Sequence, residues 1–150
     1  MRIAGTCIAR MYAYIDPRGG WLIINGTPGK AAEEFISLLH KAAGSLLIAQ
    51  LRTKRMPYIA LTNWLADTPP DGWKIGDRAT LRDLDESGDV WSASSADLSS
   101  DYTHAHLDAD QAVTRLAVEW RSRLSCVLCE DCTVRRLRFS DVVLESLADT

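Results

Sequence analysis

Strict alternation of apolar with polar, charged or small residues dominates one stretch near the C-terminal end of the chain. The apolar residues of this stretch are Leu116, Val118 and Trp120. The residues that alternate with them are Arg115, Ala117, Glu119 and Arg121. Successive side chains of a strand point to opposite faces, so this period of two predicts a half-buried β-strand. Arg115 and Arg121 are expected on the face away from Leu116.

Two further strands are predicted directly after this one. They span Leu124 to Cys129 and Thr133 to Phe139, joined at residues 130–132. Alternation places Arg136 and Arg138 on one face of the last strand, opposite Leu137 and Phe139. If these strands pair, the sheet has one apolar face and one cationic face. A short helix is expected after Ser140.

The first part of the chain has the pattern of a hairpin followed by two helices. Strands are predicted at residues 11–15 and 21–24 around the turn 17–20. A helix should follow, with Thr27 as its cap and Pro28 in its first turn, and end at Gly44. After it we expect a short strand at 46–51, a basic loop at 52–57 and a helix from Tyr58 to Ala66.

The middle of the chain indicates a strand pair and a further helix. Strands at 78–84 and 90–93 flank an acidic turn, and Ser95 or Asp97 can begin a helix that runs to about Ala109. The predicted fold class is therefore α+β: a mostly antiparallel sheet with packed helices and a C-terminal three-stranded antiparallel unit. We expect residues 1–150 to form a single domain, with residues 1–8 as an unrelated leader.

Charge is distributed unevenly along the chain. Residues 1–60 carry 8 Lys/Arg against 3 Asp/Glu, residues 61–110 carry 3 against 11, and residues 111–150 carry 6 of each. The net charge of −3 thus conceals two arginine-containing segments around an acidic middle. Such asymmetry permits a nucleic-acid partner without proving one.

Composition indicates the general class of protein. With 47% hydrophobic and 25% charged residues, the sequence is typical of a folded globular domain. No apolar run approaches the roughly 20 residues of a membrane-spanning helix, and no signal peptide is apparent. We therefore expect a cytoplasmic protein without a membrane partner, whose four cysteines are thiols.

Cys126, Cys129 and Cys132 are spaced like metal ligands, but strand alternation argues against a metal site. It sends Cys126 and Cys129 to opposite faces, and no fourth ligand lies nearby in the sequence. We therefore expect Cys126 and Cys129 to lie in a strand and Cys132 in a turn, with no bound metal.

Other candidate motifs also favour ordinary structural roles. Residues 26–30 lie between a strand and a helix but lack the spacing and hydroxyl of a phosphate loop. His104 and His106 would diverge on a helix. The acidic turn with Asp83 and Asp85 is read as a solvated loop, although a magnesium-dependent nuclease site there is an alternative. We expect no catalytic residues, no cofactor and no small-molecule substrate.

Many short segments, in order from about residue 9 onward, resemble one protein family, that of the bacterial recombination-associated protein RdgC. The segments that carry the resemblance are Tyr14–Asp16, Ala32–Glu34, Ser37–Leu39, Leu61–Leu65, Asp97–Ser100, His106–Ala109, Val113–Ala117, Trp120, Arg123–Leu128 and Arg135–Asp141. The matching segments correspond to the middle half of a family member.

The resemblance implies a nucleoid-associated protein that binds double-stranded DNA without sequence preference and restrains RecA-dependent recombination. It also implies a ring-shaped homodimer whose positive central hole encloses the duplex, with no metal or nucleotide. One departure concerns residues 110–112, Asp-Gln-Ala, where the family has Gly-Lys-Gln. By position, Gln111 carries over as a polar DNA contact, while a cation of the family is lost and Asp110 adds an acid.

These observations combine into one expected site and one alternative. The expected DNA-binding residues are Arg115, Arg121, Arg136, Arg138 and Gln111, with Arg52, Lys54 and Arg55 of the basic loop as weaker candidates. The alternative is a folded remnant without DNA-binding activity.

Overall fold

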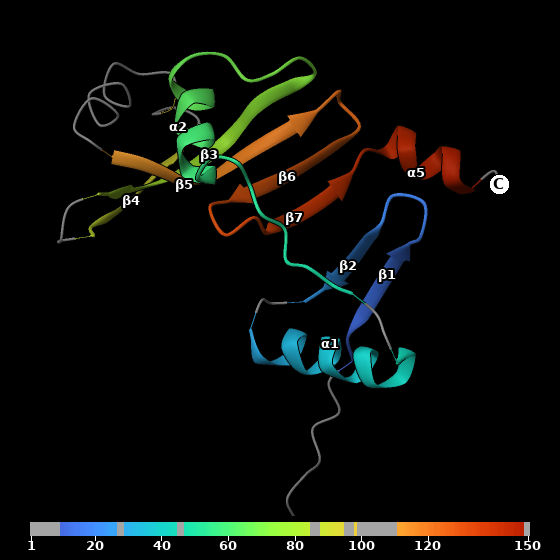
Figure 1. Cartoon of the computed structure of the whole chain (residues 1–150). Coiled ribbons are helices and arrows are strands. Elements are labelled where there is room, and N and C mark those ends of the chain that lie inside the picture. Colours follow the sequence, from blue (N-terminus) through green and yellow to red (C-terminus); the bar gives the residue numbers. More distant parts are fainter. Residues whose placement is uncertain are drawn as a thin grey trace, which may run out of the picture. The chain divides into compact units, whose positions relative to one another are not determined.

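The computed structural model describes residues 10–26, 29–44, 47–84, 88–94, 98 and 111–148 (Figure 1). The chain divides into two compact units, Met1–Gln50 and Leu51–Thr150, each described here by itself. The single domain expected from the sequence stays a prediction. The proposed leader at residues 1–8 and the helix from Ser95 or Asp97 to Ala109 lie outside the described residues, apart from Leu98.

The first unit consists of a hairpin and one helix, as the sequence predicts. Strands β1 (Tyr12–Asp16) and β2 (Trp21–Asn25) pair antiparallel. The carboxylate of Asp16 closes the turn by accepting the backbone N–H groups of Arg18 and Gly19, at 3.0 Å each. Helix α1 (Lys30–Ala43) follows and ends at Gly44, whose φ of 75° suits a residue without a side chain.

Two local expectations for this region were wrong. Gly29, rather than Thr27, occupies the N-cap position of α1, so the helix begins later than predicted; Thr27 and Pro28 themselves lie outside the described residues. The strand expected at 46–51 is absent from its described part, 47–51. Leu47 is fully exposed and the boundary between the two units follows Gln50, and residues 47–51 pair with none of the described strands.

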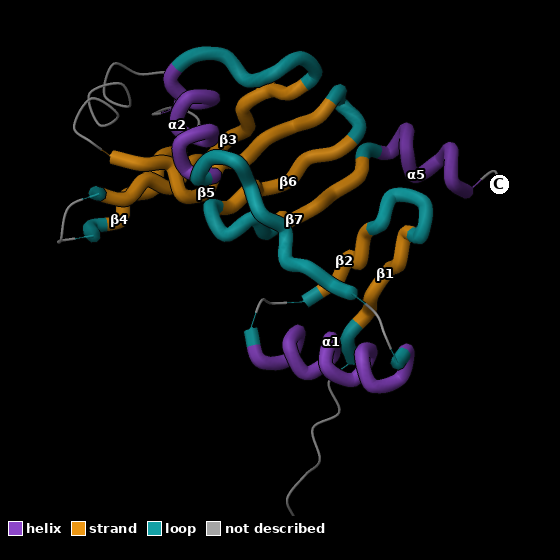
Figure 2. The backbone as a smooth tube through the Cα atoms, in the orientation of Figure 1, coloured by secondary structure: helices purple, strands orange, loops and turns teal. Residues whose placement is uncertain are grey.

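The second unit is a five-stranded antiparallel sheet with a helix on one face (Figure 2). The strands lie in the order β4-β3-β5-β6-β7. Their bounds are β3 Trp73–Asp83, β4 Val90–Ser94, β5 Gln111–Trp120, β6 Leu124–Cys129 and β7 Val134–Phe139, and the helices are α2 Pro57–Ala66 and α5 Asp141–Ala148. The α+β class and the C-terminal three-stranded unit β5-β6-β7 are confirmed.

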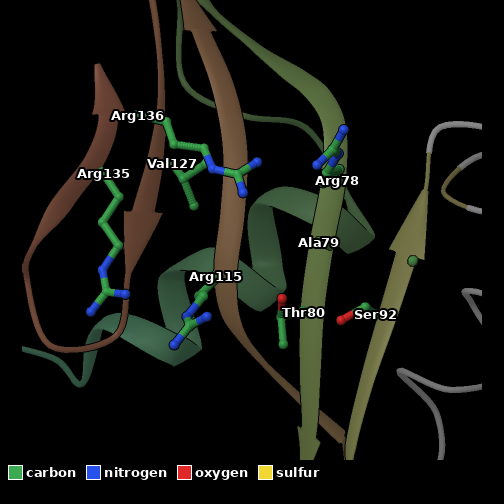
Figure 3. A pocket seen from close by; sticks show the side chains of 9 residues that line it. Arg78, Ala79, Thr80, Ser92, Arg115, Val127, Arg135 and Arg136 are labelled. Atoms are coloured by element: carbon green, nitrogen blue, oxygen red, sulfur yellow. The ribbon is translucent and has the colours of Figure 1, made fainter.

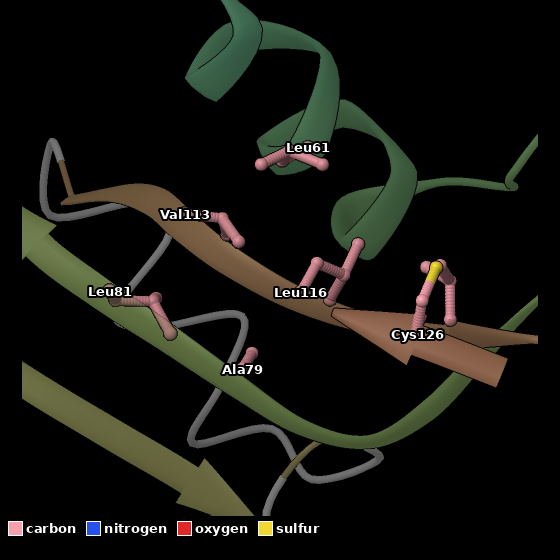
Figure 4. Close-up of a cluster of buried hydrophobic side chains, with 7 residues drawn as sticks. Leu61, Ala79, Leu81, Val113, Leu116 and Cys126 are labelled. Carbon is pink, nitrogen blue, oxygen red and sulfur yellow. The ribbon is translucent and has the colours of Figure 1, made fainter. Parts of the chain in front are cut away.

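The core lies between α2 and the sheet (Figure 4). Leu61 of α2 packs with buried side chains from three strands: Ala79, Leu81, Val113, Leu116, Val118 and Cys126. A hydrogen bond joins the two layers, because the Thr62 hydroxyl accepts the backbone N–H of Val113 at 2.9 Å. Removal of these side chains from water is the main stabilisation of this unit.

Strand β5 differs from the half-buried strand expected from its alternation. It is the central strand, and Ala117, on the face away from α2, is also buried. The alternation itself is correct: Leu116 and Val118 point to the core, and Arg115 is exposed on the other face. A small side chain between two neighbouring strands is covered by the larger side chains beside it.

Candidate functional site

The face of the sheet away from α2 carries most of the arginines of the second unit. The register places Arg115 and Ala117 of β5 opposite Cys129 and Val127 of β6, and Val127 in turn opposite Arg135 of β7. We call this surface the cationic face. In Figure 3, α2 lies behind the strands and the arginine side chains lie in front of them.

Two adjoining hollows cross the cationic face. The first, about 360 Å³, is lined by Arg78, Thr80, Ser92, Arg115, Arg135 and Arg136, among others (Figure 3). The second, about 440 Å³, shares Arg78, Val127 and Arg136 with the first and adds Arg138 at its far end. Together they form one trough that runs over all five strands of the sheet.

The floor of the trough consists of small residues. Gly76 and Ala117 line it, with Ser125 beside them. A Cβ atom at Gly76 would lie 3.0 Å from that of Ala117, so a side chain at position 76 would require the neighbouring strand to shift by a few tenths of an ångström. Asp77 and Glu119 also line the second hollow, so its charge is mixed, whereas no acidic residue lines the first.

A β-bulge in β7 explains how three arginines of one strand reach the same side. Ser125 pairs with Arg138 and Val127 with Arg135, so two residues of β7 lie opposite Cys126 alone. Arg136 occupies the bulge with a left-handed φ of 51°. The extra residue puts Arg135 and Arg138 on one face, where strict alternation would separate them.

Ion pairs divide these arginines into two groups. Arg78 lies 3.6 Å from Asp77, Arg135 lies 3.9 Å from Asp131, and Arg82 pairs with Glu130 at 2.9 Å. Arg115, Arg136 and Arg138 form no ion pair with any carboxylate that the structure describes. Their charges are therefore the ones most available to an anionic partner.

The structure thus brings together three of the arginines expected from the sequence, Arg115, Arg136 and Arg138, and adds two more. Arg78 is a position that alternation could have found, since Arg78, Thr80 and Arg82 form a polar face of β3. Arg135 could not have been found, because only the bulge turns it to this side.

Arg121 is placed differently from the expectation. Strand β5 ends at Trp120, and Arg121 lies in the following turn with a positive φ of 48°. Its guanidinium stacks over the Trp120 ring, 5.1 Å from the centroid, and its side chain packs beside Gly72. The turn, rather than the strand period, sets its direction, and it does not line the trough.

The remaining candidates are also outside the trough. The side-chain amide of Gln111 donates a hydrogen bond to the Asp83 carboxylate. Arg52, Lys54 and Arg55 are exposed in the loop before α2, and Lys54 and Arg55 line a pocket on the α2 side of the sheet.

The cysteines occupy the two strand positions and one turn position expected. Cys126 pairs with Val118 and Cys129 with Arg115, which are positions on opposite faces of β6. Burial, together with the neighbouring Cys129, raises the pKa of the Cys126 thiol. Among the residues in described segments, no three His, Cys, Asp or Glu side chains are grouped as metal ligands. His104, His106, Asp85 and Glu86 lie outside those segments.

Comparison with known proteins gives one consistent result. Residues 4–150 match the family model described as "Putative exonuclease, RdgC". The recombination-associated proteins RdgC of Pseudoalteromonas translucida (strain TAC 125) and Halorhodospira halophila (strain DSM 244 / SL1) are 34% and 36% identical to this chain, over 92% and 93% of its length. These alignments cover 46% and 47% of the two relatives, so the chain spans about half their length.

No described helix is long and apolar enough to cross a membrane.

Proposed function

Because this chain belongs to the RdgC family, we propose that it is a recombination-associated protein that binds duplex DNA without sequence preference through its cationic face. The observation that carries the proposal is the trough, where Arg115, Arg136 and Arg138 have no acidic partner among the described residues. Guanidinium groups are well suited to phosphate because they donate two parallel hydrogen bonds.

The arrangement supports contact with the phosphate backbone rather than with base edges. The arginines are spread along a trough across the face of a sheet, and none of those that line it lies on a helix that could enter a groove. Phosphate contacts position a protein on DNA but carry no sequence information. Binding should therefore be similar for all duplexes and sensitive to salt.

The proposal includes the setting of the protein. A protein that binds DNA in this way would associate with the nucleoid in the cytoplasm.

We also propose a homodimer. The support for it is an apolar strip on β7 and α5, in which Leu137, Phe139, Val142 and Leu144 are between 48% and 74% exposed. Exposed apolar strips of this kind commonly mark association surfaces.

An electrophoretic mobility shift with random-sequence duplexes tests the central proposal. The double variant Arg115→Ala, Arg136→Ala should bind at least about tenfold more weakly in dilute salt, because two phosphate contacts are lost. The matched control is Lys30→Ala, Arg121→Ala, which removes the same charge outside the trough and should bind almost normally. Equal weakening by both variants, or none by either, would contradict the cationic face as the binding site, and no binding by the unaltered chain would leave the folded remnant as the better account.

A second candidate, a nuclease, is suggested by the description of the matching family model. We propose instead that the chain is not an enzyme. The described acids of the middle region support this, since Asp83 accepts a hydrogen bond from Gln111 and its backbone N–H bonds to the Asp89 carbonyl at 3.0 Å. Labelled DNA incubated with magnesium or manganese should stay intact. Cleavage that disappears in Asp83→Ala would establish the nuclease.

A further inference from the structure

An open hollow with a mainly apolar lining lies on the opposite side of the sheet from the trough. It has a volume of about 550 Å³, within the range of ligand-binding pockets. Its apolar lining comes from Leu51, Ala60, Leu61, Trp64, Leu128 and Val134, which belong to the loop before α2, to α2 itself and to the strands β6 and β7. We call it the α2 pocket.

The apolar walls of the α2 pocket are open to solvent at its rim. Leu51 is 53% exposed and Val134 is 55% exposed, whereas Leu61 at the base is buried. Apolar side chains left in water around a concave surface are stabilised when an apolar group covers them. The pocket is therefore suited to one or two apolar side chains of a partner.

Charge at the rim restricts what that partner can be. Lys54 and Arg55 line the pocket beside its apolar walls, and Arg52 lies in the same loop. No carboxylate among the described residues lines the pocket or pairs with Lys54 or Arg55. An occupant with acidic groups next to its apolar side chains complements this distribution.

The sheet edge next to the pocket favours an extended occupant. Val134, which lines the pocket, is the first residue of β7, and β7 is the last strand in the sheet order. One side of its backbone has no strand partner within the described residues. An extended peptide can pair with such an edge while its alternate side chains enter a neighbouring pocket.

We propose that the α2 pocket binds a short acidic segment of a partner protein. One or two apolar side chains of that segment cover Leu61, Trp64 and Val134, and its carboxylates lie against Lys54 and Arg55. The site faces away from Arg115 and Arg136, so a protein partner and a phosphate backbone can be held at the same time. The proposal does not depend on DNA binding.

The probe is a fluorescein-labelled peptide of four aspartates followed by two leucines and a phenylalanine. Fluorescence anisotropy should give saturable binding of this peptide to the whole chain. Two altered peptides separate the contributions: asparagines in place of the aspartates, and serines in place of the three apolar residues. Each should bind at least about fivefold more weakly, because one loses the rim contacts and the other loses the pocket contacts.

Variants of the protein provide the matching evidence. Lys54→Glu, Arg55→Glu reverses two exposed charges and should weaken peptide binding about tenfold. Val134→Asp, at a half-exposed position, should have a similar effect without disturbing the core. The control Arg18→Glu, Lys41→Glu makes the same change of net charge in the first unit and should bind the peptide normally.

Amide chemical shifts locate the bound peptide. Shifts confined to residues 51–57, 61–64 and 132–135 support the proposal. Shifts centred on Arg115 and Arg138 would overturn it, since the peptide would then be held by the cationic face alone. So would the absence of binding at millimolar peptide, which would indicate that a segment of this chain or a second copy already fills the pocket.

Discussion

Arg115 on β5 and Arg136 on β7 line one hollow, although strand β6 separates their backbones. The bulge at Arg136 and the small residues of the floor make this possible, because the side chain of Arg136 can turn inward over a surface that offers no obstruction. Arginines from three strands of this unit are therefore gathered on one face of the sheet.

Gly76→Ala should destabilise the second unit. The new methyl group would lie 3.0 Å from the Cβ of Ala117 and 3.1 Å from its carbonyl oxygen, so the two strands would have to separate. Overpacking of this kind costs about 1–3 kcal/mol. Urea denaturation monitored by circular dichroism measures the change. Gly26→Ala is the control, because its new methyl group would meet only Met11 at an ordinary 3.5 Å.

Arg121→Ala should affect stability rather than DNA binding. The guanidinium stacks on Trp120 outside the trough, and a partly exposed cation–π contact contributes about 0.5–1 kcal/mol. Thermal denaturation should show a loss of this size, while the affinity for random duplexes changes less than about twofold. A large loss of affinity with unchanged stability would show that the trough extends around the end of β5.

Cys126 should react with iodoacetamide much more slowly than Cys132. Cys126 is buried, and burial raises its pKa, so little of the reactive thiolate is present at neutral pH. Cys132 is partly exposed in the turn. Mass spectrometry of tryptic peptides after short exposure gives the two rates, and urea should make them similar. Equal rates in the folded protein would contradict the packing of Cys126 beneath α2.

Asp131 should stabilise the β6–β7 turn only while it is ionised. Partial burial opposes ionisation, but hydrogen bonds from the Thr133 hydroxyl and N–H and the charge of Arg135 leave the pKa of Asp131 below its usual value. A lowered pKa gives stability that is present above the unfolded-state pKa and is lost as the pH falls through the folded-state pKa.

Asp131→Asn tests this sign. At neutral pH the variant should be less stable by about 0.5 kcal/mol, a small value because about half of the side chain is exposed to solvent. The difference in unfolding free energy should shrink as the pH falls below the usual range of aspartate. A difference that persists unchanged in acid would show that shape, not charge, accounts for the effect.

Periodicity predicted much of the fold correctly because burial follows it. The alternation at Leu116 and Val118 placed β5, and the turn residues between Asp16 and Trp21 placed the first hairpin. The prediction of a strand from an apolar run failed at Leu47, which is fully exposed near the boundary between the two units. Composition alone cannot distinguish an exposed linker from an edge strand.

The candidate site was predictable only where the strands are regular. Arg115 lies where alternation puts it, on the face away from Leu116. Arg121 does not, because the chain turns immediately after Trp120, and a cation–π contact then directs its side chain. Arg135 joins the site through an extra residue in β7, and nothing in the local sequence indicates where a bulge will occur.

The salt dependence of duplex binding tests the central claim most directly. Each phosphate contact contributes about −0.9 to the slope of log K against log salt, so three free arginines predict a slope of about −3. Arg115→Ala should reduce its magnitude by about one and weaken binding to all duplex sequences alike. Binding that is independent of salt, or a slope that Arg115→Ala leaves unchanged, would contradict the assignment of DNA binding to the cationic face.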